Sequence, residues 1–135
     1  VQAKEGRGPE GVKNAVILLR DSGDIGAGTQ TVIQVGTNAP MNQGELDAIM
    51  AEVPADAGTV FFMTLKADVA WVPGNNELLK GLPAKYPNVQ IIDWEAESAN
   101  VELCPDGIHI SCNGNEAATF YTNLILSAFG LPAIT

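Results

Sequence analysis

Apolar runs of strand length alternate along this chain with amphipathic segments of helical length. Three near-continuous runs of β-branched and aromatic residues are candidate strands: 31–36 (TVIQVG), 59–65 (TVFFMTL) and 89–94 (VQIIDW). Unbroken apolar runs of this kind are typical of strands that are covered on both faces in a parallel sheet. A shorter candidate, 1–4 (VQAK), precedes them. The pattern therefore predicts a parallel sheet with few exposed positions.

Four amphipathic segments lie between and after these strands, at 9–22, 44–53, 75–86 and 115–130. The resulting order, β-α-β-α-β-α-β-α, predicts a three-layer α/β/α sandwich with helices on both faces of the sheet. The chain has 135 residues, of which 46% are hydrophobic. That length and composition suit one compact core, so we expect a single domain over 1–135.

The charge of the chain narrows the choice of partners. Sixteen acidic and seven basic residues give a formal net charge of −9, which would repel a phosphate backbone, so we expect no nucleic-acid partner. No apolar run approaches the ~20 residues of a membrane span. The first residues, VQAKEGRGPEG, lack the charged-then-apolar order of a signal peptide. We expect a soluble chain whose targeting segment, and any membrane contact, would lie in a segment upstream of this sequence.

Polar motifs follow each predicted strand. Gly6 comes after the first strand, Asn38 after the second, Trp71 after the third, and Asp106 and His109 after the fourth. In open parallel sheets, ligands and catalytic groups collect in the loops beyond the carboxyl ends of the strands. The five residues are therefore predicted to lie on one rim of the sheet.

Asp106 and His109, in the motif DGIH, have the spacing of a catalytic pair. A carboxylate three residues before an imidazole can accept the Nδ1 proton and hold Nε2 toward a site, as in nucleophilic acyl chemistry. His109 is the only histidine of the chain, and a lone histidine is more often structural than catalytic. Asn38 and Gly6 would be oxyanion donors through a side-chain amide and a backbone N–H, although both residues are also ordinary in turns.

Cys104 and Cys112 flank this pair and allow three interpretations. A disulfide is favoured, because the surrounding CPDG and CNGN segments are polar turns, and it would imply an oxidising compartment. Two buried reduced thiols are the second interpretation. Zinc is the weakest, because one histidine and two cysteines fall short of four ligands, so we expect no metal. We also expect no cofactor, because a flavin or nucleotide domain would need a Gly-rich phosphate loop, which the chain lacks.

Two motifs together, GTN after one strand and DGIH before the last helix, resemble the SGNH (GDSL-like) hydrolase superfamily. The segments VQAKEGR, TVIQVGTNAP, KYPNVQIIDW and PDGIHIS are similar to the C-terminal extracytoplasmic domain of bacterial peptidoglycan O-acetyltransferases and related acyltransferase-3 proteins. The similarity extends over nearly the whole chain. It implies a flavodoxin-like sheet, a Ser-His-Asp triad, an extracytoplasmic location, and esterase or O-acyl-transfer chemistry on acyl esters of cell-wall glycans.

Matching positions imply individual roles within that family. His109 would be the base, Asp106 its orienter, Asn38 an oxyanion donor and Gly6 a second one. Trp71 resembles a family tryptophan that borders the substrate. The family usually has Arg-Pro before this tryptophan, whereas Val69 and Ala70 stand here.

The family's nucleophile is a serine in a Gly-Asp-Ser motif on a strand that this sequence does not contain. In the family's order that strand lies between 1–4 and 31–36, so we expect a sheet that lacks its first strand and is completed by an upstream segment or a second chain. Ser22 is predicted at the wrong end of the sheet, and Ser111 suits a turn or helix cap. The alternative to an enzyme is an inactive module of the same fold that binds glycans.

Overall fold

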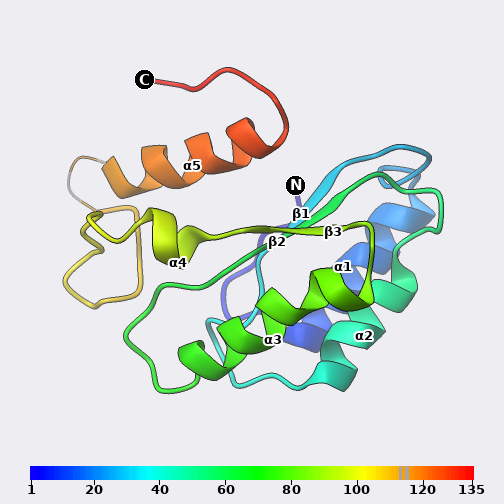
Figure 1. Cartoon of the computed structure of the whole chain (residues 1–135), viewed down its shortest axis with the longest axis horizontal. Coiled ribbons are helices and arrows are strands. Elements are labelled where there is room, and N and C mark those ends of the chain that lie inside the picture. Colours follow the sequence, from blue (N-terminus) through cyan, green and yellow to red (C-terminus); the bar gives the residue numbers. More distant parts are fainter. Residues whose placement is uncertain (113, 115) are drawn as a thin grey trace.

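The computed structural model describes residues 1–112, 114 and 116–135, and these form an α/β fold (Figure 1). Three strands and five helices follow one another along the chain: α1 (Pro9–Asp21), β1 (Thr31–Ile33), α2 (Gln43–Glu52), β2 (Val60–Met63), α3 (Val72–Lys85), β3 (Val89–Ile92), α4 (Trp94–Glu97) and α5 (Glu116–Ala128). The described strands make one parallel sheet in the order β1-β2-β3. The α/β class and the parallel sheet are thus confirmed. The full three-layer, flavodoxin-like sandwich stays a prediction.

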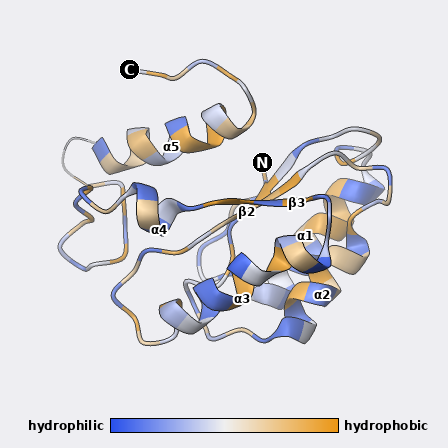
Figure 2. Cartoon of the chain, in the orientation of Figure 1, coloured by the Kyte–Doolittle hydropathy of each residue, from blue (hydrophilic) through white to orange (hydrophobic). Residues whose placement is uncertain are grey.

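The central strand β2 explains why its apolar run is unbroken. All four of its residues are buried, and alternate side chains point to opposite faces of the sheet. Phe62 packs in a cluster with Leu46 of α2 and Leu79 of α3. Phe61 packs in a second cluster, with residues of α5. Apolar residues accordingly run along the strands and along the helix surfaces that face them (Figure 2).

Local sequence accounts for where the helices begin. Pro9 opens α1 with a backbone angle that suits the first helical turn. Asn42 caps α2, because its side chain accepts the N–H of Glu45 while the Glu45 carboxylate accepts the N–H of Asn42. The helix predicted at 75–86 begins earlier, at Val72, since Pro73 also falls in its first turn. None of the helices in the described part of the chain is long and apolar enough to cross a membrane.

One predicted element is absent, and one element that is present was not predicted. Residues 1–4 form no strand, because a strand needs a neighbour for its backbone groups and these residues pair with none of the three described strands. The short helix α4 was not expected. The Asp93 side chain accepts the N–H of Ala96 and starts this single turn, which is too short to show a helical period in the sequence.

Candidate functional site

The Asp106–His109 pair has the geometry expected from its spacing. Asp106 Oδ2 lies 2.5 Å from His109 Nδ1. The other carboxylate oxygen, Oδ1, accepts the backbone N–H groups of Ile108 and His109 at 2.9 and 3.0 Å. One oxygen therefore shapes the turn and the second one orients the imidazole. With Nδ1 donating to the carboxylate, Nε2 is the ring nitrogen left to exchange a proton with a reactant.

A disulfide closes the loop that carries this pair. Cys104 and Cys112 are bonded, with their Cα atoms 5.8 Å apart, so the disulfide interpretation is confirmed and the two interpretations with free thiols are wrong. Inside the loop, the Cys104 N–H donates to His109 O and the Gly107 N–H donates to Cys104 O, both at 2.8 Å. Cys104 is buried. The exposed pair is thus tied through the sulfur bridge to the body of the protein.

The pair is electrostatically coupled. The hydrogen bond from His109, followed by the backbone N–H groups of His109 and Ile108, lowers the pKa of Asp106 to about 2. The Asp106 carboxylate in turn raises the pKa of His109, by hydrogen bonding and by its charge, and the charge of Glu5 adds a smaller effect. Both side chains are largely exposed, so water screens the attraction. His109 is nevertheless a neutral base only above a raised pKa.

The loop before α1 meets the loop after β1. Asn38 Nδ2 donates to Arg7 O at 3.2 Å, and Gly6, next to Arg7, adopts a left-handed φ of 70° in an exposed turn. Asn38 is exposed and its amide has a second hydrogen to offer. The structure therefore brings the two predicted oxyanion donors to one place. Their role as donors stays a prediction.

The loop after β2 contacts the disulfide loop. The Asp68 N–H donates to Gly107 O at 2.9 Å. A Cβ on Gly107 would lie only 3.0 Å from the Asp68 Cβ, and Gly107 has a φ of 71°, so glycine is required for this approach. The loop that carries Asp106 and His109 is thereby fixed against the carboxyl end of the sheet.

Trp71 connects the loop after β2 to the loop after β1. Its Nε1–H donates to Thr37 O at 3.0 Å, and its half-buried ring packs against the main core. It stands at the N-cap position of α3. The contact ties the loop after β2 to the loop that bears Asn38. Contact with a substrate stays a prediction for the exposed part of the ring.

Sequence reasoning missed Asn75, which is buried at 2% exposure in the first turns of α3. Its Oδ1 accepts the Met41 N–H at 2.8 Å, and its Nδ2 donates to Gly36 O and Ala39 O at 2.8 and 2.9 Å. This one side chain makes hydrogen bonds to backbone groups on both sides of Asn38. The signal in the sequence was an asparagine on the face of α3 that should have been apolar.

A second buried asparagine and a lysine hold the segment that leads to the disulfide loop. Asn76 pairs with the backbone of Leu65, accepting its N–H at 2.7 Å and donating to its carbonyl at 2.9 Å. Lys66 Nζ donates to Val101 O at 2.6 Å and also to Ser98 O. These bonds join the end of β2 to residues 98–101. The signal in the sequence was a charged residue, Lys66, directly after the buried strand run at 59–65.

The four serines lie in different surroundings. Ser22 follows α1 at the amino end of the sheet and donates to Leu19 O and Asp24 Oδ2, so its predicted place is confirmed. Ser98 is buried and donates to Trp94 O. Ser127 is exposed on α5, and Ser111 is exposed two residues after His109. Only Ser111 shares a loop with the pair.

Fold and site together define a class: an α/β protein with an aspartate–histidine pair on loops beyond the carboxyl ends of a parallel sheet. No protein-family model matches the chain, and a search of curated proteins finds no similar sequence. The resemblance to SGNH hydrolases thus has no independent support. Within the described ranges, no three His, Cys, Asp or Glu side chains gather as metal ligands would.

Proposed function

We propose that this chain belongs to a serine-type esterase or O-acyltransferase that acts on acyl esters of cell-wall glycans outside the cytoplasm. The observation that carries the proposal is the 2.5 Å contact between Asp106 Oδ2 and His109 Nδ1 on a disulfide-closed loop. A carboxylate that orients an exposed imidazole is two thirds of a triad. The disulfide is compatible with an oxidising compartment. The resemblance of the GTN and DGIH motifs to those of SGNH hydrolases points to the same chemistry.

The proposed reaction uses a serine from outside residues 1–135. Its Oγ attacks the acyl carbonyl while His109 Nε2 takes the hydroxyl proton, and Asp106 stabilises the resulting imidazolium. The second N–H of the Asn38 amide stabilises the oxyanion. His109 then gives its proton to the departing alcohol, which leaves an acyl-serine. Water or a glycan hydroxyl, deprotonated by His109, attacks that ester and releases the serine.

The experiment compares two proteins on small acetyl esters and with a serine-directed fluorophosphonate. Residues 1–135 alone should neither turn over the ester nor label. The same residues with a strand bearing Gly-Asp-Ser fused ahead of Val1 should do both. His109→Ala should then abolish turnover, and Asp106→Asn should reduce it by several orders of magnitude, about 10⁴-fold in the best-known triad.

Ser111 gives the control variant for this experiment. Turnover by residues 1–135 alone that disappears in Ser111→Ala would assign the nucleophile to the disulfide loop and would refute an external serine. Ser127→Ala, an exposed serine on α5, is the matched substitution that should change nothing.

A glycan-binding module without activity is the second candidate. It is favoured by the placement of the described serines, of which only Ser111 lies near the pair. Under this hypothesis, O-acetylated glycan fragments would shift the NMR signals of His109 and Trp71, while the fused protein would not hydrolyse acetyl esters.

A further inference from the structure

The outer edge of β1 has no partner strand among the described residues. β1 pairs only with β2, and the N–H of Thr31 points that way, donating to Thr59 O at 3.0 Å. In a parallel ladder, one residue directs its N–H and its C=O to the same side of the strand, and the next residue directs both groups to the opposite side. The N–H and C=O groups of Gln30, Val32 and Gln34 therefore point away from β2. Such an edge is a template for another strand.

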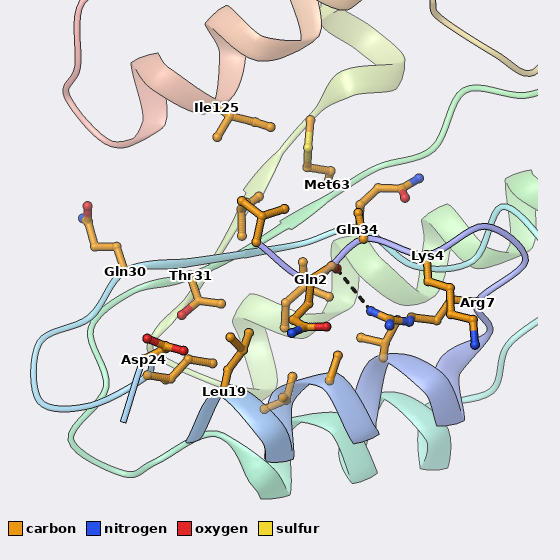
Figure 3. Close-up of a pocket in the computed structure, with 18 of the residues that line it drawn as sticks. Gln2, Lys4, Arg7, Leu19, Asp24, Gln30, Thr31, Gln34, Met63 and Ile125 are labelled. Atoms are coloured by element: carbon orange, nitrogen blue, oxygen red, sulfur yellow. Dashed lines mark hydrogen bonds between the residues drawn. The ribbon is translucent and has the colours of Figure 1, made fainter. Parts of the chain in front are cut away.

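A groove of about 630 Å³ runs along this edge (Figure 3). Residues 29–34 all line it, which is a length of ~20 Å in an extended chain. Its two walls are apolar. One wall belongs to α1 and the loop after it, with Val16, Leu19 and Ile25; the other belongs to α5 and the residue after it, with Tyr121, Ile125 and Phe129. The exposed residues 1–4 also line the groove, and Gln2 lies between β1 and α1, so a bound strand displaces the end of this segment (Figure 3). A strand in this groove would be covered on both faces, as a strand inside a parallel sheet is.

The groove also contains an unsatisfied polar group. The Oγ1 atom of Thr31 is buried and has no hydrogen-bond partner within the described part of the chain. A buried hydroxyl without a partner costs free energy, so such groups are rare in complete structures. A threonine hydroxyl of a strand beside β1 would offer this group a partner, whereas the backbone of that strand would pair with Gln30, Val32 and Gln34.

The charges at the two ends of the groove differ in sign. Asp24 lies near the start of β1, whereas Lys4 and Arg7 lie toward its carboxyl end (Figure 3). A strand parallel to β1 would place its amino end near Asp24 and its carboxyl end near Lys4 and Arg7. Charge complementarity therefore favours a basic group at the start of the strand and an acidic group at its end.

From these observations we propose that the groove binds one extended peptide segment from outside residues 1–135, parallel to β1. The segment has about six residues that are apolar on both faces, a basic residue before them and an acidic residue after them. Its backbone pairs with Gln30, Val32 and Gln34. Since Asn38 lines the same groove, the carboxyl end of the bound segment reaches the loop that bears Asn38. Binding itself does not depend on the proposed acyl transfer.

The test uses synthetic peptides and the whole chain. The forward peptide has a lysine at its amino end, about six valine and threonine residues, and an aspartate at its carboxyl end. The reversed-charge peptide exchanges the two end residues. A third peptide is the forward peptide with its backbone amides N-methylated at alternate positions on the side facing β1. The readouts are titration by NMR and amide hydrogen exchange of Val32.

The forward peptide should bind saturably and slow exchange of the Val32 amide. The reversed-charge peptide should bind about tenfold more weakly, and the N-methylated peptide should not bind. In the double variant Lys4→Glu, Asp24→Lys, the preference between forward and reversed peptides should invert. Val32→Pro removes the N–H that faces the groove and part of the Val32 packing against the second cluster; at a strand edge it should still fold and should lose binding.

Three results would overturn the proposal. Equal binding of the N-methylated peptide would reduce the effect to non-specific apolar contact. A dimer of this chain that excludes the peptide would identify a second copy as the occupant. Failure of the forward peptide to bind at millimolar concentration, with native exchange elsewhere in the sheet, would show that the edge accepts no strand.

Discussion

Removing the disulfide tests how the loop around His109 is held. In the double variant Cys104→Ala, Cys112→Ala the crosslink between positions eight residues apart is lost. The chain-entropy relation for a loop of this length gives about 2.5 kcal/mol of lost stability. For a urea m-value of about 2 kcal/mol/M, the unfolding midpoint should fall by about 1.2 M. Alanine is the replacement of choice, because a serine hydroxyl at the buried position 104 would add a second effect.

The same variant should also change His109. Its raised pKa depends on Asp106 staying at hydrogen-bond distance, and the closed loop restricts both residues. In the open loop the pKa of His109 should move down toward the ordinary value of 6.5. Because the chain contains one histidine, a single imidazole signal in the proton NMR spectrum reports it.

Two results would contradict this reasoning about the loop. An unchanged urea midpoint with an unchanged m-value would show that loop closure contributes nothing to stability. An unchanged pKa of His109 in a destabilised variant would show that the Asx-type turn at Asp106, without the sulfur bridge, already fixes the pair.

Asp106→Asn, with the disulfide intact, should lower the pKa of His109 because it removes the carboxylate that raises it, and an NMR titration measures the change. The pair also links stability to pH: the His109 contribution is present below 6.5 and is lost as pH rises through its raised pKa, while the Asp106 contribution is present above 3.8 and is lost as pH falls toward about 2. Urea midpoints measured from about pH 3 to about pH 9 should lose both dependences in Asp106→Asn. Gly36→Ala should destabilise the fold by about 3 kcal/mol or more, since Gly36 has a φ of 109° and a Cβ there would lie 2.7 Å from Met41 Cε. Gly74→Ala in α3, where a Cβ meets nothing within 4 Å, is the matched control and should stabilise by about 0.5–1 kcal/mol.

Much of the fold could be predicted from residue patterns that act locally. The unbroken run at 59–65 predicted a strand buried on both faces, and β2 is one. Helices with a clear apolar period were placed to within a few residues. The strand predicted at 1–4 was wrong for a non-local reason. A β-strand depends on a pairing partner, and the composition of a segment does not say whether a partner is present. The single turn of α4 depends on one side-chain cap and leaves no period.

The parts of the site that could be predicted are those whose interacting residues lie close together in the sequence. The spacing of Asp106 and His109 and the polar turns around Cys104 and Cys112 are local features, and the structure has both the hydrogen bond and the disulfide. The supports of the site are different. Asn75 acts on residues more than thirty positions away. A polar residue in a helix does not by itself predict its distant hydrogen-bond partners, because the sequence does not reveal which loop will pack on that helix.

The groove follows the outer edge of β1, whereas the Asp106–His109 pair lies on a loop that is held at the carboxyl end of the sheet. Residues that follow β1 pass from the groove through Gly36 to Asn38, and Asn38 Nδ2 bonds to Arg7 O at the groove's basic end. The disulfide loop is held by the loop after β2, through the hydrogen bond from the Asp68 N–H to Gly107 O. A parallel strand beside β1 would therefore end at the loop that bears Asn38, whereas the Asp106–His109 pair belongs to a different loop. Strand binding would be driven by apolar burial and backbone pairing, whereas proton transfer would depend on the protonation of His109. Peptide affinity should accordingly be independent of pH around the pKa of His109. The variant His109→Ala should bind the forward peptide as tightly as the native chain does. A loss of affinity in that variant would mean that the imidazole is part of the peptide-binding surface and not a separate catalytic base.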